Sequence, residues 1–135
     1  MSEIITNKLT GKTAAGNVTI TSEGGSATMQ LQQGVAKQWA HIQGLGSPTV
    51  SDSLNVASIT DVGTGNFKQN CTNNFANDDY SFTAAGREQS HFAVVQEHNT
   101  SARTTSNSHS LSGRSDSGAG VDIDGRNITV HGDLA

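Results

Sequence analysis

Oxygen ligands stand at alternate positions in the segment Asp122–Asn127, which contains two aspartates and an asparagine. Such groups suit Ca²⁺, but a loop of the EF-hand type needs its glycine at the sixth position and a glutamate at the twelfth. Gly125 is the fourth residue here, and Arg126 adds a positive charge. The Asp-Gly pair is typical of a tight hairpin turn. We therefore predict a hairpin between strands Val121–Asp124 and Asn127–Val130, and neither a metal nor another cofactor.

Histidine is the next residue type that could bind a metal, and five occur, at positions 41, 91, 98, 109 and 131. His91 and His98 are the one pair that could share a strand, and they would lie at its opposite ends. In a trimer, three copies of one histidine could meet on the axis. His109, in a Ser-rich segment, is the candidate for that arrangement, with a plain surface residue as the expected reading.

Catalytic groups are the third kind of chemistry to consider. Serines are abundant, but none stands in a Gly-x-Ser-x-Gly turn. Asp78 and Asp79 are adjacent acids, and their polar surroundings indicate a solvated loop instead of an acid/base pair. We predict that the protein is not an enzyme. A glycan-cleaving spike, with carboxylates in a groove between subunits, stays open as an alternative.

The charge balance argues against nucleic acid as a partner. Eight Lys and Arg face twelve Asp and Glu, for a net charge of −4, and the basic residues are scattered. Phosphate contacts need a positive footprint, so we expect no nucleic-acid binding. Arg103, Arg114 and Arg126 could contact acidic surface sugars if the C-terminal loops face outward.

Membrane insertion and disulfide formation are also not expected. No apolar run approaches the about 18 residues that indicate a spanning helix, and the start lacks the layout of a secretory signal. Cys71 is the sole cysteine, so no intrachain disulfide can form, and we interpret it as a buried thiol. We expect synthesis in the host cytoplasm.

Residues 37–71 carry the clearest strand signals. Apolar and polar residues alternate in Gln38–Gln43, Thr49–Thr60 and Gly65–Cys71, and turn-forming glycines with Pro48 separate these segments. The alternation shifts at Asn55, which indicates a bend or bulge. We predict an antiparallel meander of three strands.

We predict a hairpin or arm over residues 1–25, followed by one β domain over 26–135. The strands of the hairpin would be Ile4–Leu9 and Asn17–Thr21, and a lone hairpin of this size is marginal in water. We therefore expect it to lie on the domain, on a copy of itself or on a docking protein. A flexible joint is expected at Glu23–Ser26. Residues 27–39 leave helix and strand open, with strand favoured before Gly34.

The C-terminal half adds further short strands. We predict Tyr80–Ala84, and a strand His91–Glu97 whose continuous apolar run suggests that both faces are covered. Residues 99–120 are rich in Ser, Thr and Gly, a composition shared by disordered segments and by strands of fibrous phage proteins. About eight to ten short strands at this spacing indicate an all-β antiparallel sandwich or jelly-roll-like module.

Large side chains for the core are few. Aromatic residues make up 4% of the chain, and a small domain buries a smaller fraction of its surface than a large one. Oligomerisation would compensate, and we expect a homotrimer. Trp39 and Phe67 are predicted at the centre of the core. The candidates for core or assembly contacts are Trp39, Leu54, Val56, Ile59, Phe67, Tyr80, Phe82 and Phe92.

A longer pattern of residues gives a resemblance to a known family. The pattern is Ala36-Lys37-x-Trp39, Gly44-x-Gly46, Asp52-Ser53-x-Asn55-Val56-x-Ser58-Ile59-x-Asp61-x-Gly63-x-Gly65, Asn70, Tyr80 and the final segment Ile128–Ala135. It resembles a domain that recurs in tail-fibre-like virion proteins of marine bacteriophages of the cyanophage type, and it spans Gln30 to the C-terminus. His131 departs from it, since an aromatic residue is expected there.

The resemblance implies a structural or host-contacting part of a virus particle. We therefore expect a non-enzymatic virion protein, a short trimeric tail-fibre-like or tail-associated component that joins other virion proteins and contacts a host-surface glycan. In such proteins the N-terminal end commonly faces the particle, which makes residues 1–25 the candidate attachment segment. The alternative is a capsid decoration protein, of the cement or head-fibre kind, whose arm grips neighbouring capsid subunits.

Overall fold

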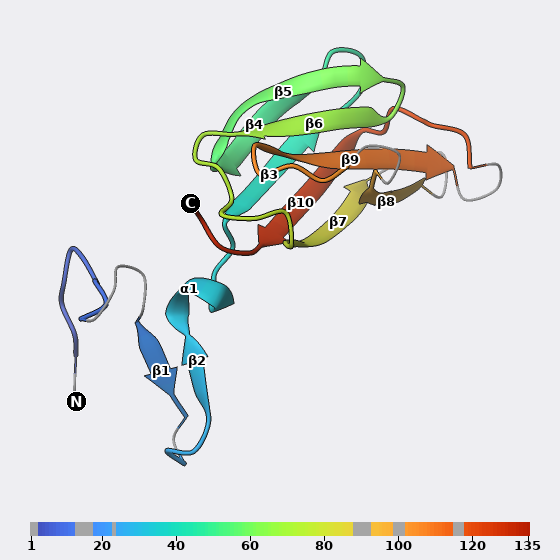
Figure 1. Cartoon of the computed structure of the whole chain (residues 1–135). Helices are drawn as coiled ribbons and strands as arrows, with labels where there is room; N and C mark the ends of the chain where they lie inside the picture. Colours follow the sequence, from blue (N-terminus) through green and yellow to red (C-terminus); the bar gives the residue numbers. More distant parts are fainter. Residues whose placement is uncertain (1–2, 13–17, 23, 88–92, 99–101, 115–117) are drawn as a thin grey trace. The chain divides into compact units, whose positions relative to one another are not determined.

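The chain folds into two compact units, Met1–Val35 and Ala36–Ala135 (Figure 1). The structure is a computed structural model and describes residues 3–12, 18–22, 24–87, 93–98, 102–114 and 118–135. The larger unit is all-β and consists of two four-stranded antiparallel sheets packed against each other. The predicted fold class, an all-β sandwich, is thus confirmed.

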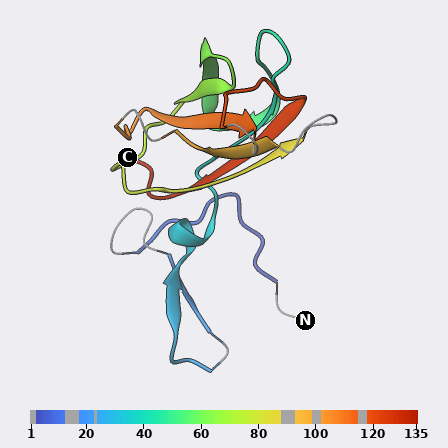
Figure 2. The same ribbon diagram turned by 90° about the vertical axis from the view of Figure 1, so that its right-hand side faces the viewer.

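The two sheets have different strand orders. The first runs β4-β3-β10-β7, formed by Thr49–Leu54, Gln38–Gln43, Gly125–His131 and Ser81–Arg87. The second runs β5-β6-β9-β8, formed by Val56–Gly63, Asn66–Cys71, Asn107–Arg114 and Ala93–Glu97. In Figure 2 the orange β9 runs over the red β10, one layer above the other. Each sheet therefore combines strands from the beginning and the end of the unit.

The chain changes from one sheet to the other at Asn55. This residue has a left-handed φ of 58°, which Asn adopts more readily than most residues. Its side chain is fixed by Asn73, whose backbone N–H donates to Oδ1 at 2.7 Å and whose carbonyl accepts from Nδ2 at 2.9 Å. The predicted three-strand meander is therefore wrong, because the bend expected at Asn55 separates strands of opposite layers.

Alternation along β3 decides what enters the core. Gln38, Ala40 and Ile42 are buried between the sheets, which leaves Trp39 and His41 on the outer face. One apolar cluster consists of Ala40, Ile42, Phe67 and Ile128, and a second of Phe75, Tyr80 and Val130. The sandwich thus has a modest apolar core at its centre and towards one end.

The predicted core residues divide accordingly. Phe67 and Tyr80 are buried, and Val56, Ile59 and Phe82 are half-buried against the clusters. As core residues, two assignments are wrong for the same reason: Trp39 is half-buried on the outer face of β3, and Leu54, opposite it on the edge strand β4, is 46% exposed. The alternative role of both as assembly contacts stays a prediction. Phe92 lies outside the described residues.

The strands of the C-terminal half depart from prediction at β8. It forms the edge of its sheet, and Val94 is 52% exposed. The expectation that both faces of this strand are covered is therefore wrong. β9 gives order to the middle of the Ser-rich segment, and its alternating serines at 108, 110 and 112 point into the sandwich.

The predicted final hairpin is also wrong. β10 is one strand, paired with β3 and β7, and residues 121–124 form no strand. Asp122 instead accepts a hydrogen bond from the Gly65 N–H at 2.7 Å, and Ile123 is fully buried. This segment closes the end of the sandwich instead of turning back along β10.

The N-terminal unit contains a hairpin with partners other than those predicted. β1 (Thr19–Thr21) pairs with β2 (Thr28–Gln30), and one helical turn, α1 (Leu31–Gly34), follows. The expected strand at 4–9 is absent from described residues 3–12. The Ser22 N–H donates to the Ala27 carbonyl at 2.8 Å, and residues 24–26 of the expected joint form a turn. Residues 26–35 thus lie with the first unit.

The described part of the chain has no helix of the length and apolar character that a membrane span requires.

Candidate functional site

A fully buried arginine, Arg126 of β10, lies between the two sheets, beside the turn that joins β5 to β6. Its Nη1 donates to the Gly65 carbonyl at 3.0 Å and to Ser110 Oγ at 3.3 Å, and its Nη2 donates to Ser112 Oγ at 2.9 Å. The guanidinium carbon lies 4.0 Å from the centre of the Phe67 ring. Burial lowers the pKa of Arg126 to about 10, against the opposing effect of Asp122 and Asp61, so it remains charged at neutral pH.

The polar network continues along the interior through Gln69 and Gln38. Gln69 Nε2 donates to Ser110 Oγ at 2.7 Å, and Ser108 Oγ donates to Gln38 Oε1 at 2.6 Å. Gln38 Nε2 crosses between the sheets to the Gln69 carbonyl at 3.2 Å. These groups bond one another inside the protein, as buried polar groups must. The network therefore links the two sheets through the interior of the sandwich.

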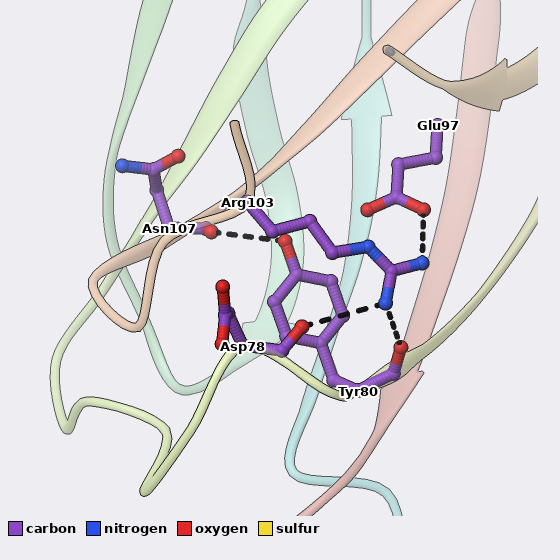
Figure 3. Close-up of polar contacts among 5 residues, drawn as sticks. All are labelled: Asp78, Tyr80, Glu97, Arg103 and Asn107. Atoms are coloured by element: carbon purple, nitrogen blue, oxygen red, sulfur yellow. Dashed lines mark hydrogen bonds and ion pairs between the residues drawn. The ribbon is translucent and has the colours of Figure 1, made fainter. Parts of the chain in front are cut away.

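Arg103 bonds two other segments, one containing Asp78 and Tyr80 and one containing Glu97, as Figure 3 shows. Its Nη1 donates to the Tyr80 carbonyl at 2.7 Å and to the Asp78 carbonyl at 3.4 Å. Its Nη2 forms an ion pair with Glu97 at 2.6 Å. The guanidinium carbon also lies 4.9 Å from the centre of the Tyr80 ring. We call Arg103, Tyr80 and Glu97 the arginine clasp.

The clasp ties β8 to the segment that enters β7. The Tyr80 hydroxyl donates to the Asn107 carbonyl at 3.4 Å, and its ring centre lies 4.9 Å from that of Phe75. Burial raises the pKa of Tyr80 to about 12, with Glu97 adding to the effect. Asp78 enters this arrangement through its backbone carbonyl and not its carboxylate. A phenol in this setting is a packing group and not an acid at neutral pH.

His109 of β9 stacks on His98, with the ring centres 4.3 Å apart and the planes inclined by 25°. His109 Nε2 is hydrogen-bonded to Asn66 Oδ1, and the buried Nδ1 has no partner among the described residues. Burial lowers the pKa of His109 to about 4, and the nearby His98 and Lys68 add to this effect. The expectation of a plain surface histidine is wrong, because the His109 side chain is buried under the stacked His98 ring.

The three arginines considered as sugar contacts have different surroundings. Arg126 is buried and cannot reach a surface ligand, so that expectation is wrong for it. Arg103 is exposed but engaged in the clasp. The side chain of Arg114 and all of His91 lie outside the described residues. Cys71 is half-buried, and burial raises the pKa of its thiol to about 11.

The N-terminal unit presents large apolar side chains to solvent. None of residues 3–12, 18–22 and 24–35 is buried. Ile4 and Ile5 are 85% and 86% exposed. The exposed set, which we call the N-terminal apolar set, is Ile4, Ile5, Leu9, Ile20, Met29 and Val35. Exposed apolar patches mark interaction sites, so these side chains are candidates for contact with a partner.

Sequence reasoning missed the Arg126 network and the outer position of Trp39. The outer position of Trp39 could have been found from the alternation through Gln38–Ile42, which places Trp39 on the face of His41 and away from Ala40. The network leaves no such signal, because Arg and Ser are ordinarily surface residues. Within the described ranges, no three His, Cys, Asp or Glu side chains are placed to hold a metal ion.

Comparisons of the chain with models of protein families, with curated proteins and with solved structures find no match. The chain thus consists of a β-sandwich unit, whose core contains a hydrogen-bonded polar network, and a preceding small unit whose large apolar side chains are exposed.

Proposed function

We infer that this chain is a non-enzymatic virion structural protein, a short trimeric tail-fibre-like or tail-associated component. In this proposal the N-terminal unit joins the protein to the particle and the sandwich faces outward. The observation that carries it is the uncovered N-terminal apolar set, and the resemblance of residues 30–135 to phage tail-fibre-like proteins supplies the biological setting. The location would be the virion.

The physical argument starts from the size of the hairpin. Two three-residue strands and one helical turn bury none of their described side chains, and an isolated two-stranded hairpin is marginal in water. Each large apolar side chain that becomes fully buried contributes about 1.5–3 kcal/mol. Covering this unit with copies of itself or with another virion protein would therefore stabilise both the unit and the assembly.

The test is a double substitution, Ile4→Asp with Ile5→Asp, in the full chain. We expect the unaltered protein to be a trimer by light scattering and to copurify with particles. The variant should lose attachment, because two charges would enter the apolar contact. Val94→Asp, at an exposed apolar position of the sandwich, is the matched control and should behave as the unaltered protein. Unchanged attachment of the double variant would overturn the proposal.

The same measurement separates the two kinds of virion protein. A trimer in solution supports the fibre-like component. A monomer that still copurifies with particles through Ile4 and Ile5 supports a capsid decoration protein instead, since its unit would then be covered by capsid subunits.

A further inference from the structure

The outer face of the sheet β4-β3-β10-β7 gathers an unusual set of side chains. Trp39, the single tryptophan, lies opposite Leu54 of β4 and Thr129 of β10. In the next row of the same face, His41 lies opposite Asp52 and Asn127. Directly opposed side chains on one face of a sheet stand about 4.5–5.5 Å apart at Cβ. The two rows therefore form one continuous surface.

Small residues lie beside these rows. Ala85 pairs with Asn127, and Gly125 pairs with Arg87. A Cβ added at Gly125 would lie 3.6 Å from His41 Nε2 and 3.9 Å from Arg87 Cβ. The glycine thus leaves room for about one methyl group between the imidazole and the arginine stem, and Arg87 and His41 stand at the rim of this hollow.

The exposure of the set fits a ligand surface. His41, Asp52, Asn127 and Arg87 are exposed, and Trp39 is half-buried outside both apolar clusters. Asp52 Oδ1 accepts a hydrogen bond from the Ser53 N–H at 2.8 Å, which orients the carboxylate. The sandwich core does not use the indole, so its uncovered part is available for contact.

We propose that this outer face binds a saccharide. The apolar C–H face of a sugar ring packs on an indole, and the surrounding hydroxyls need donors and acceptors at sheet spacing. Trp39 and Leu54 supply the apolar part. Asp52, Asn127 and His41 supply acceptors and donors. Arg87 and His41, beside the Gly125 hollow, would receive an acceptor oxygen of the ligand, from a hydroxyl or from a carboxylate.

A protein partner fits the same surface less well. An apolar protein contact would cover the polar row of Asp52, His41 and Asn127, and buried polar groups without partners cost free energy. A saccharide satisfies these groups with its own hydroxyls. The inference deepens the proposed function, because it gives the outward-facing sandwich a host-surface ligand, and it rests on that function for its biological setting.

The experiment is a titration of the purified full chain with dextran and mannan as neutral glycans and with alginate as a polyuronate. Trp39 is the sole tryptophan, so its fluorescence reports directly on this face. We expect a saturable change in emission with at least one glycan. Asn127→Ala should weaken that binding at least about tenfold, as the loss of a good hydrogen-bonding group does. Trp39→Ala removes the fluorophore, so its glycan binding is measured by titration calorimetry. We expect this variant not to bind.

Two further variants make the test independent of folding. Gly125→Ala adds a Cβ at ordinary contact distance, so the chain should fold with an unchanged urea midpoint while the filled hollow weakens binding. Asn70→Ala, on the outer face of the other sheet, is the control and should bind as the unaltered protein. If Arg87→Ala weakens the binding of alginate and not that of the neutral glycans, the ligand group that accepts from Arg87 is a carboxylate.

Absence of emission change and heat with all three glycans would overturn the inference, as would binding that none of the outer-face variants alters. Neither result touches particle attachment, which depends on Ile4 and Ile5. Failure of the saccharide site and failure of the proposed virion role are therefore separate outcomes.

Discussion

The two units of this chain place their side chains in opposite ways. In the sandwich, Arg126 and the serines of β9 are buried between the sheets. In the N-terminal unit, isoleucines and a methionine are exposed. The apolar clusters contain residues of the second unit alone. The sandwich thus buries polar groups that largely bond one another, whereas the N-terminal unit carries apolar surface that a partner would cover.

The contrast shows how a chain poor in aromatic residues builds a core. The sandwich fills part of its interior with the Arg126 guanidinium, which lies over the Phe67 ring, and with serines that accept its hydrogen bonds. Polar side chains that bond one another inside a sheet pair specify register more sharply than apolar packing alone. The N-terminal unit lacks both devices. Its stability should accordingly depend on assembly, and that of the sandwich should not.

The largest loss of stability is expected for substitution of a buried aromatic residue, compared with one on the outer face. Phe67→Ala should lower the free energy of unfolding by about 3–5 kcal/mol, because it leaves a cavity under the Arg126 guanidinium. Trp39→Ala, on the outer face, should cost about 1 kcal/mol. Urea unfolding of the full chain measures both. Equal losses for the two variants would show that Trp39 belongs to the core after all.

The next effect concerns the buried network. Arg126→Ala should lower the free energy of unfolding by about 3 kcal/mol, since Ser110, Ser112 and the Gly65 carbonyl lose a buried donor. Arg126→Met keeps most of the volume and removes the charge, and should recover part of the loss. The comparison is again made by urea unfolding. If the alanine variant is as stable as the unaltered protein, the network does not hold the sheets.

A smaller effect should appear in the pH dependence of stability. His109 has a folded pKa of about 4, and the unfolded value is about 6.5. The unfolded state therefore binds more protons between these values, so stability is full above about pH 6.5 and falls as the pH drops towards 4, by about 2–3 kcal/mol.

The matched control for that titration is His109→Gln, whose amide can still donate to Asn66. It should flatten the unfolding free energy between pH 6.5 and 4 relative to the unaltered protein. A parallel pH profile for both proteins would mean that His109 is not the group responsible.

The smallest effect is expected from removing the first unit. Deletion of residues 1–35 should change the free energy of unfolding of the sandwich by less than about 0.5 kcal/mol, because no residue of that unit lies in the apolar clusters. The same deletion should abolish attachment to particles. Thermal unfolding followed by circular dichroism checks the first part, and a loss of the sandwich transition would contradict the independence of the two units.

Several strands could be predicted because their signals are local. Gln38–Gln43 has the bounds expected for it, and the glycines with Pro48 mark the turn that follows. Asn55 was visible as a break in alternation, but whether a break bends a strand or transfers it to another sheet depends on which partner strand is available. Thr19–Thr21 shows the same limit, since it pairs with β2 and not with residues 4–9.

The candidate sites were less accessible to prediction. Strand alternation places Trp39 on the same face as His41, which indicates an outer position. Hydrophobicity alone would instead assign the only tryptophan to the core. Arg126 carries no local mark of burial. Its partners Ser110 and Gly65 come from distant segments, and its charge is tolerated because those groups and Phe67 surround it.

The class of fold could be predicted from local patterns, because strand alternation and turn residues are properties of neighbours in the chain. The composition likewise indicates that large apolar side chains are scarce. The strand order, the inward face of β9 and the outward position of Trp39 are visible only in the folded structure. These depend on long-range pairing and on the balance of burial over the whole sandwich, where a hydrogen-bonded arginine and serines fill space that local patterns assign to apolar residues.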